Sequence, residues 1–373
     1  METAVLTKAI KERALELGFI RVGIAPADDF VAYAEALKKR SQEYEFVMNM
    51  PAGPYGGAIL SRTSPEARSI VCVAYDYGDI AYPEKLTKSV GRAYLSRSYL
   101  PLADSIGGAR LSMFRRFLAE NGCQVYNEYE LPERLACARA GIVTFGKNTF
   151  AYAGETGSFI ILSAIPVDRT LDYDEPTMES HCPKGCRKCL DACPTKAYVE
   201  PGRLNPQKCL SYNHWVAKRV PESIRALNGP RIHGCDVCQE ACPINQQRLK
   251  NTGKKDMFLE HIASLFDLEK VLGMGEKYYM QVVHPIMYNY IPRIKIFQRN
   301  AAYALGNEKD EYHVPALGKA LCESEPMVRE SAAWALGHIG GHKAKEALDK
   351  GHRETQTDQV YQAIQQAMKR MES

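Results

Sequence analysis

Apolar and polar positions alternate with different periods along the first half of the chain. Leu6, Ile10 and Leu17 recur at helical spacing in a charged N-terminal segment, which predicts an amphipathic helix. Residues 109–121 show the same helical pattern, whereas residues 69–75 and 158–165 are short β-rich runs that predict strands. The pattern therefore predicts an α+β domain over residues 1–174.

The C-terminal part carries an internal repeat. The Ala-Ala-aromatic-Ala-Leu-Gly pattern that begins at Ala301 and ends at Gly306 recurs from Ala332 to Gly337. Small residues at helical spacing before a glycine predict packed helices that each end in a glycine cap. We therefore expect a HEAT-like helical repeat over residues 251–373. It would serve either as a structural cap on the preceding domain or as a binding surface.

Length and composition limit the number of domains and the expected place of the protein in the cell. With 373 residues, of which 45% are hydrophobic and 25% charged, the chain is long enough for two or three globular domains. Residues 169–180 are rich in Asp, Glu, Thr and Pro and predict the connection into a second domain at 175–250. The charged start does not resemble a signal peptide, and no apolar run approaches the roughly twenty residues that span a bilayer. We expect a cytoplasmic protein without a membrane partner.

The net charge of +4 is too small to indicate nucleic-acid binding by itself, because such domains are usually strongly basic. Basic residues before the tail helices would nevertheless suit phosphates, and a solvated surface is the alternative. These residues are Arg293, Lys295 and Arg299.

Eight of the twelve cysteines form a pattern typical of iron–sulfur proteins. Two blocks hold seven of them, and the blocks end in Cys193-Pro194 and Cys242-Pro243. Cysteines three apart bind one cubane from a single loop, whereas a cysteine four further on points toward a second cluster. The chain is therefore expected to carry electrons.

Crossed ligation, as in bacterial two-cluster ferredoxins, divides these cysteines into two sets. The first 4Fe-4S cluster is expected at Cys182, Cys186, Cys189 and Cys242. The second is expected at Cys193, Cys209, Cys235 and Cys238. Three residues separate the first two cysteines where the ferredoxin run has two, which makes Cys182 an irregular ligand.

Structural zinc is the competing interpretation of these cysteines, since paired Cys-x-x-Cys elements also build four-thiolate zinc sites. The two Cys-Pro endings favour iron–sulfur. The other cysteines lie in apolar or helical segments and are expected to be small hydrophobic residues without a chemical role. They are Cys72, Cys123, Cys137 and Cys322.

The order of an α+β domain, a two-cluster ferredoxin-like domain and a HEAT-like tail resembles the epoxyqueuosine reductase family, cobalamin-dependent enzymes that complete queuosine in tRNA. The similarity extends over most of the chain. Its closest segments are residues 62–71, 133–134, 140–141, 146–149, 157–159, 189–195, 209–212 and 234–239.

This resemblance implies an oxidoreductase of queuosine biosynthesis and tRNA processing that is supplied by an external low-potential electron donor. Electrons would pass through both clusters to a corrinoid held between residues 1–174 and the nearer cluster. Its cobalt(I) would attack the epoxide carbon while an acid supplies protons. Ser211, Cys235 and Asp236 would line the corrinoid on the cluster side, and the helical repeat would contact tRNA.

The chain departs from the family at the supposed proton donor. The family's Asp-Thr-Gly-Pro stretch falls on residues 127–130, so that Asn127 stands where the acid is expected. A carboxamide has no titratable proton at useful pH. Neighbouring Glu or Tyr side chains could replace it. These candidates are Glu128, Tyr129, Tyr126 and Glu130.

This departure leaves two other functions open. One is a related corrinoid and iron–sulfur reductase of a small molecule, similar to reductive dehalogenases, whose acid is typically Tyr. The other is a non-catalytic iron–sulfur electron-transfer protein, which would need no acid. A simple carrier would not need the family-like residues 133–149 either.

Overall fold

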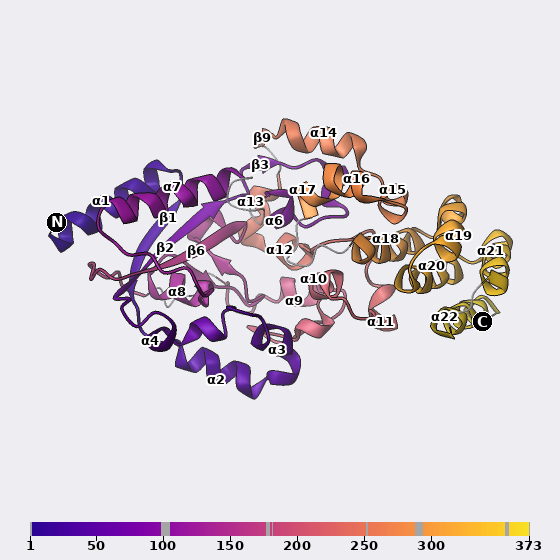
Figure 1. The fold of residues 1–373 in the computed structure, drawn as a ribbon, viewed down its shortest axis with the longest axis horizontal. Coiled ribbons are helices and arrows are strands. Elements are labelled where there is room, and N and C mark those ends of the chain that lie inside the picture. Colours follow the sequence, from indigo (N-terminus) through magenta and orange to yellow (C-terminus); the bar gives the residue numbers. More distant parts are fainter. Residues whose placement is uncertain are drawn as a thin grey trace. The chain divides into compact units, whose positions relative to one another are not determined.

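The structure of the chain is a computed structural model that describes residues 2–97, 105–176, 180, 182–250, 253–287, 294–354 and 358–372. It divides into two compact units (Figure 1). Unit 1 consists of Met1–Ile80, Leu100–Gln207 and Val237–Gly253. Unit 2 consists of Ala81–Tyr99, Lys208–Asp236 and Lys254–Ser373.

Unit 1 combines short strands with helices of very different length. Its strands are β1 (Arg21–Pro26), β2 (Ser69–Asp76), β4 (Thr144–Phe145), β5 (Ala151–Tyr152), β6 (Ile160–Val167), β7 (Tyr198–Glu200) and β8 (Arg203–Leu204). Its helices include α1 (Thr3–Glu16), α2 (Val31–Lys39), α3 (Ser41–Met48), α4 (Leu60–Thr63), α7 (Ile106–Glu120), α8 (Glu133–Arg139), α9 (Lys188–Ala192), α12 (Val237–Glu240) and α13 (Gln246–Leu249).

The main sheet of unit 1 pairs β1, β2 and β6 in that order, all antiparallel. Helices α1 and α7 cover one face, and α8 covers the other (Figure 1). Successive strand residues point to opposite faces, so Val71 and Val73 join the core with α1 and α7, whereas Ile70 and Cys72 join the core with α8. The sheet therefore has apolar packing on both faces.

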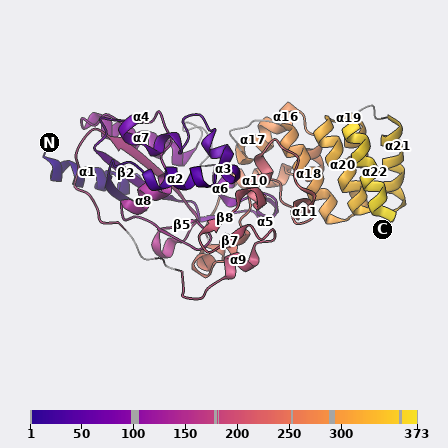
Figure 2. The same ribbon diagram turned by 90° about the horizontal axis from the view of Figure 1, so that it is seen from below.

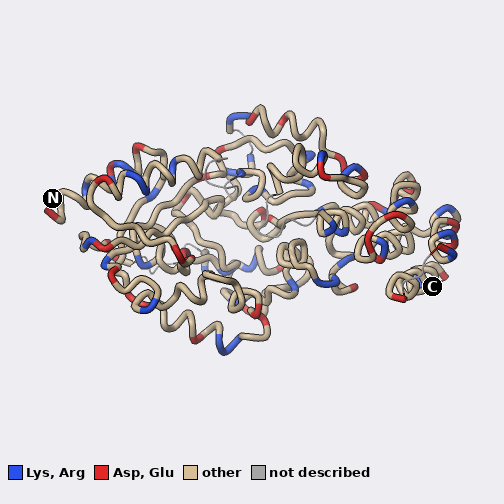
Figure 3. Tube along the Cα trace, in the orientation of Figure 1, with Lys and Arg blue, Asp and Glu red and all other residues tan. Residues whose placement is uncertain are grey.

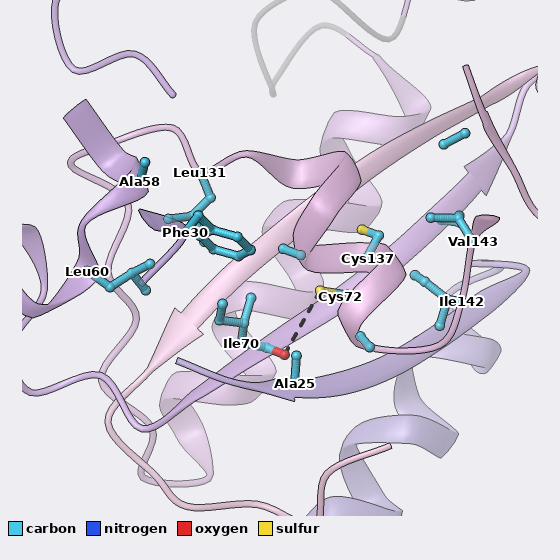
Figure 4. Close-up of a cluster of buried hydrophobic side chains, with 14 of the residues drawn as sticks. Ala25, Phe30, Ala58, Leu60, Ile70, Cys72, Leu131, Cys137, Ile142 and Val143 are labelled. Atoms are coloured by element: carbon cyan, nitrogen blue, oxygen red, sulfur yellow. Dashed lines mark hydrogen bonds between the residues drawn. The ribbon is translucent and has the colours of Figure 1, made fainter. Parts of the chain in front are cut away.

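Two cysteines outside the cluster pattern lie in the α8 core (Figure 4). Cys72 and Cys137 are fully buried, and the Cys72 thiol lies 4.0 Å from the carbonyl oxygen of Ile70. Burial, followed by the neighbouring Cys72 thiol, raises the pKa of Cys137 well above its ordinary value. A thiol that stays protonated in an apolar core acts as a small hydrophobic group.

Unit 2 is mainly helical. Its helices include α5 (Glu84–Thr87), α6 (Arg92–Leu95), α10 (Leu210–Trp215), α11 (Glu222–Arg225), α14 (Met257–Leu265), α15 (Leu268–Leu272), α16 (Glu276–Tyr278), α17 (His284–Met287), α18 (Ile294–Glu308), α19 (Val314–Glu323), α20 (Pro326–Ile339), α21 (Gly341–Glu354) and α22 (Asp358–Glu372). A π-helix occupies Tyr279–Val283, and β9 is Lys254–Lys255.

The repeat predicted from the sequence is present as the stacked helices α18 to α22 (Figure 2). Glycines allow close helix packing there. A methyl group at Gly306 would lie 2.8 Å from Cα of Ala335, and one at Gly337 would lie 2.7 Å from Cα of Ala367. The two repeated glycines therefore let α20 approach α18 and let α22 approach α20.

The predicted glycine caps are wrong. Gly306 and Gly337 lie inside α18 and α20, which continue to Glu308 and Ile339. The residue that follows α20 is Gly340, whose φ of 75° is in the left-handed region that glycine adopts without strain. The sequence shows a small residue at Gly306 and Gly337, but it does not show that a second helix packs against each of them.

The predicted fold class is confirmed. The chain combines an α+β unit with a C-terminal helical repeat, and the strands predicted at 69–75 and 158–165 correspond to β2 and β6. The helices predicted near the N-terminus and at 109–121 correspond to α1 and α7. Within the described ranges, no helix is long and apolar enough to cross a membrane.

A histidine between two carboxylates predicts a pH-dependent stability of unit 2. His313 Nδ1 lies 2.7 Å from Glu269 Oε1, and its Nε2 lies 2.8 Å from Glu308 Oε2. Burial alone would lower the pKa of His313, but the hydrogen bonds and charges of these carboxylates outweigh burial and raise it. The stabilising contribution is therefore complete below the unfolded-state pKa of about 6.5 and is lost as the pH rises through the folded-state pKa.

We expect His313→Gln to lower the thermal midpoint more at acidic than at alkaline pH. Because Glu269 and Glu308 are partly exposed, the extra loss of unfolding free energy at acidic pH should be about 1 kcal/mol. Thermal unfolding of the wild type and of His313→Gln, at acidic and at alkaline pH, measures this loss. An equal loss at every pH would contradict the charged bridge.

Candidate functional site

The first predicted cysteine set lies within unit 1, where α9 packs against α12. Cys189 and Cys242 are buried, and Cys182 and Cys186 are partly exposed. Burial, followed by the charges of Cys182 and Cys242, raises the pKa of Cys189. Cys182, Cys189 and Cys242 therefore interact electrostatically, but the described side chains form no group of three or more His, Cys, Asp or Glu that could hold a metal ion.

Lys147 holds the loop that carries the first two cysteines. Its backbone N–H donates to the Cys182 sulfur over 3.3 Å. Its Nζ donates to the carbonyl oxygens of Pro183 and Cys186 over 3.2 and 2.9 Å. N–H donors to cysteine sulfur orient the ligand and influence the reduction potential of an iron–sulfur cluster. The irregularly spaced Cys182 thus has a defined position.

Tyr152 plays the corresponding part at the other end of this cysteine set. Its hydroxyl donates to the Cys242 sulfur over 3.3 Å and accepts from Asn148 Nδ2 over 2.8 Å. Asn148 and Tyr152 are buried. Burial, followed by Cys242, raises the pKa of the phenol, so Tyr152 keeps its proton and remains a donor.

We expect Tyr152→Phe to retain the cluster but to lower its reduction potential. One net hydrogen bond of about 1 kcal/mol corresponds to about 40 mV for a one-electron couple. Redox titration followed by paramagnetic resonance measures the shift. Tyr198→Phe is the matched control, because the Tyr198 hydroxyl donates to the Asn148 carbonyl over 3.1 Å and not to sulfur. Equal shifts in both variants would contradict the assignment.

A buried polar network fixes the segment between the second cysteine block and the sheet. Asn245 Oδ1 accepts from the backbone N–H of Ser158 over 3.0 Å, and its Nδ2 donates to the Gln239 carbonyl over 2.9 Å. The Ser158 hydroxyl donates to Gln239 Oε1 over 2.9 Å. Gly157 has a φ of 82°, and a methyl group there would collide with Asn245. Satisfied buried networks of this kind make a structure rigid.

The second predicted set is divided between the units. In unit 1, the buried Cys193 sulfur accepts from the backbone N–H of Ala197 over 3.3 Å, and Cys238 is partly exposed. In unit 2, Cys209 immediately precedes α10, and Cys235 is partly exposed. This set remains a prediction from the cysteine spacing.

Of the residues predicted to line a corrinoid, Asp236 has the most defined surroundings. It is buried, and its Oδ2 accepts from the backbone N–H of Arg92 over 2.8 Å and from Arg92 Nη1 over 3.1 Å. Ser211 lies in the first turn of α10 and is partly buried, as is Cys235. A hydroxyl and a fixed carboxylate are suitable hydrogen-bonding groups for a polar ligand.

Arg299, predicted to suit a phosphate, is instead fully buried. Its Nη1 donates to the carbonyls of Val216 and Lys218 over 2.7 and 2.8 Å, and its Nη2 donates to that of Asn213 over 2.8 Å. Burial, followed by the charge of Arg225, lowers the pKa of Arg299 to about 10, which leaves it charged. The phosphate interpretation is therefore wrong for this residue.

The other two basic candidates have different outcomes. Lys295 forms an ion pair with Glu325 at 2.8 Å, and Arg293 lies outside the described residues. Asn300, beside Arg299, donates to the carbonyls of His214 and Ile232 over 2.6 and 2.8 Å. It thereby ties the helix that carries Ser211 to the segment that leads into Cys235 and Asp236.

The predicted catalytic residues lie in the loop before α8. Asn127, Glu128 and Tyr129 are all exposed, and a methyl group at Gly56 would lie 3.3 Å from the Tyr129 ring. The Tyr126 hydroxyl has no hydrogen-bond partner among the described residues. The proton-donor assignment of these residues remains a prediction.

Glu133, the first residue of α8, is a carboxyl group with a shifted pKa that was not among the predicted site residues. Protein packed around its carboxyl, followed by the charge of Glu130, raises the pKa of Glu133 to about 7. The backbone N–H of Ala164 and the charges of Arg115 and Arg134 oppose this rise. The residue as a whole is nevertheless exposed. Its presence in a family-like segment was the available signal.

Comparisons with known proteins agree with the cysteine pattern and the repeat. A family model described as a 4Fe-4S double cluster binding domain matches residues 181–245, and a model of HEAT repeats matches residues 295–369. The first match favours iron–sulfur clusters over the zinc alternative.

Full-length relatives are similar over almost the whole chain. An epoxyqueuosine reductase of Staphylococcus aureus is 30% identical, and the match covers 94% of this chain and 93% of the relative. One of Pseudomonas aeruginosa is 31% identical, with 91% and 96% covered.

Solved structures are similar to the same extent. A selenomethionine-labelled epoxyqueuosine reductase gives a TM-score of 0.84 at 25% identity, with 98% of this chain and 99% of that chain covered. An epoxyqueuosine reductase with an epoxyqueuosine-modified tRNA-Tyr stem loop gives a TM-score of 0.82 at 25% identity, with 99% of each chain covered.

Proposed function

The chain belongs to the epoxyqueuosine reductase family and is an iron–sulfur oxidoreductase, and we propose that it removes the epoxide oxygen of epoxyqueuosine in tRNA with a corrinoid as cofactor. The main observation behind this proposal is that hydrogen bonds from neighbouring residues hold the first cysteine set in position. Lys147 and Asn148 belong to the family-like residues 146–149, and they position Cys182 directly and Cys242 through Tyr152.

The first cysteine set fits a 4Fe-4S cluster by its chemistry. Cys182, Cys186, Cys189 and Cys242 supply four thiols, and N–H and O–H donors point at two of the sulfurs. We assign the second cluster to Cys193, Cys209, Cys235 and Cys238 on their spacing alone. Clusters of this type pass single electrons at low potential, so an external one-electron donor completes the proposal.

Ser211, Cys235 and Asp236 are our candidates for the corrinoid-facing residues. When bound, a corrinoid supplies a low-valent cobalt nucleophile. The Ser211 hydroxyl and the Asp236 carboxylate would hold water or the amides of such a ligand by hydrogen bonds, and Arg92 keeps the Asp236 carboxylate in place. The donor set therefore fits this cofactor in kind.

The helical repeat is our candidate for the tRNA-binding surface. Positive and negative residues alternate around α21 (Figure 3), so this helix presents a surface of mixed sign. We expect RNA contacts with a limited number of phosphates. Affinity for an epoxyqueuosine stem loop should then fall with salt, and a binding titration at several salt concentrations tests this. Affinity independent of salt would contradict phosphate contacts.

Anaerobic reconstitution with iron, sulfide and cobalamin tests the cofactors. We expect about eight irons per chain and bound cobalt that is retained through gel filtration, together with paramagnetic resonance signals of both cofactors. Iron without cobalt would contradict the corrinoid and leave an electron-transfer protein. Absence of low-potential redox activity would contradict the whole proposal.

A further inference from the structure

The segment that carries the first two predicted cluster ligands faces solvent. Cys182 and Cys186 are partly exposed, and every residue between them is exposed. Gly185 has a φ of 77°, and a methyl group built there would meet no described atom within 4 Å outside its own chain neighbours. Residues 183–188, which form the basic loop, therefore present an open surface beside two of the predicted ligands.

The basic loop concentrates positive charge. Lys184, Arg187 and Lys188 are all exposed, and the loop contains no acidic residue. The chain as a whole has a net charge of +4, and residues 182–207 alone contain five Lys or Arg against two Asp or Glu. Arg187 pairs with Asp191 at 3.6 Å, but both side chains are more than 60% exposed, and such pairs are weak. The positive charge is therefore available to a partner.

The backbone of the basic loop is held from within unit 1. Lys147 Nζ donates to the carbonyl oxygens of Pro183 and Cys186, and the Lys147 carbonyl accepts from the backbone N–H of Gly202 over 2.8 Å, in the turn between β7 and β8. Val199 in β7 is 50% exposed and offers an apolar contact in the same hairpin. Weak redox complexes bury less than about 1,200 Å², so a small surface of this kind is sufficient.

The predicted order of the cofactors makes this surface the entry side for electrons. Cys235 belongs both to the second cysteine set and to the predicted corrinoid-facing residues, whereas the first set shares no residue with them. An electron that enters at the first set therefore passes the second before it reaches the corrinoid. RNA is also attracted by positive charge, but it supplies no electron. Residues 182–188 contain no aromatic ring on which an RNA base could stack.

We propose that the basic loop docks the external electron donor and that this donor is a small, strongly acidic one-electron carrier protein, an inference that rests on the proposed function. Opposite charge steers such a carrier to the loop and speeds association at low salt. In each encounter one electron leaves the reduced carrier, which is oxidised, and reduces the first cluster. No bond is made or broken and no proton moves. Two encounters supply the two electrons that removal of one epoxide oxygen consumes.

Binding of an acidic plant-type ferredoxin, a low-potential one-electron carrier, tests the docking surface. The triple variant Lys184→Gln, Arg187→Gln and Lys188→Gln should weaken its affinity by about 10-fold at low ionic strength. The difference between wild type and variant should shrink as salt screens the charges. A titration at several salt concentrations measures both effects.

A second triple variant is the matched control. Lys8→Gln, Lys38→Gln and Lys39→Gln remove the same charge from exposed positions on α1 and α2, and ferredoxin affinity should stay at the wild-type value. Equal losses in both triple variants would reduce the effect to net charge and overturn the docking surface.

Reduction of the iron–sulfur clusters, followed by rapid-freeze paramagnetic resonance, tests the electron path. With reduced ferredoxin, the basic-loop variant should be reduced about 10-fold more slowly than wild type. With reduced methyl viologen, a small cation that needs no basic docking surface, it should be reduced at least as fast. Iron analysis shows whether the variant keeps its clusters. If it loses iron, Lys184→Gln alone is used, with an expected loss of about 3-fold.

The outcomes separate the two proposals. Unchanged ferredoxin affinity and reduction rate in the basic-loop variant would overturn the docking surface and leave the proposed function intact. Weaker binding of an epoxyqueuosine stem loop, with ferredoxin binding unchanged, would make the loop an RNA contact and also overturn it. A protein that is reduced through the loop but never converts the RNA would overturn the proposed substrate and leave the electron entry site.

Discussion

Replacement of Cys189 by alanine is expected to remove one of the two clusters and, with it, all reductase activity. Cys189 is buried in unit 1, and the thiols of Cys182 and Cys242 are close enough to raise its pKa. A cubane that loses one of its four thiolates loses one of its four bonds to the protein. Iron content should fall from about eight to about four per chain.

Iron and sulfide analysis, paramagnetic resonance and turnover measure this loss together. Cys322→Ala is the matched control, because Cys322 lies on α19 in unit 2 and outside both predicted sets. It should retain all iron and full activity. Retention of eight irons by Cys189→Ala would contradict the ligand assignment, and loss of iron from both variants would point to a general folding defect.

Arg299→Leu is expected to destabilise unit 2 by about 3 kcal/mol or more, because it leaves several buried carbonyls without donors. The guanidinium of Arg299 donates to carbonyls of Asn213, Val216 and Lys218, at and just beyond the C-terminal end of α10. Leucine fills much of the space but donates no hydrogen bond. The largest energetic effect we expect in the repeat therefore comes from a residue that binds protein rather than RNA.

Denaturant unfolding measures this effect through the midpoint of the transition assigned to unit 2. Lys295→Gln, on the same helix, is the control, because a partly exposed ion pair with Glu325 contributes at most about 1 kcal/mol. Cys209 opens α10, so iron loading should also fall in Arg299→Leu. Similar midpoints for the two variants would contradict the supporting role of Arg299.

Cysteine spacing predicts the candidate cluster ligands because ligand geometry is largely local. Cys189 and its neighbours in the block come from a single short loop and helix, so their relative positions depend on few backbone angles. Lys147 could be identified only as part of the family-like residues 146–149, and Tyr152 lies outside the family-like segments. Their hydrogen bonds to cysteine sulfur depend on how distant segments fold together.

The sequence predicted the wrong role for residues whose contacts are with segments far away in the sequence. Arg299 resembled a phosphate ligand because a helical pattern does not reveal that the segment after α10 covers it. Gly306 resembled a cap because its contact with Ala335 joins two helices. The raised pKa of Glu133 was not predicted because it depends on burial and on the charge of Glu130.

Turnover of an epoxyqueuosine-modified RNA stem loop is the measurement that tests the central claim most directly. The protein, reconstituted anaerobically with iron, sulfide and cobalamin, would be given a low-potential one-electron donor, and the RNA would be analysed by mass spectrometry. We predict loss of one oxygen atom from the modified nucleoside, dependent on cobalamin and absent in Cys189→Ala. RNA of unchanged mass, from protein that carries both clusters and cobalt, would contradict the assignment of epoxyqueuosine as the substrate.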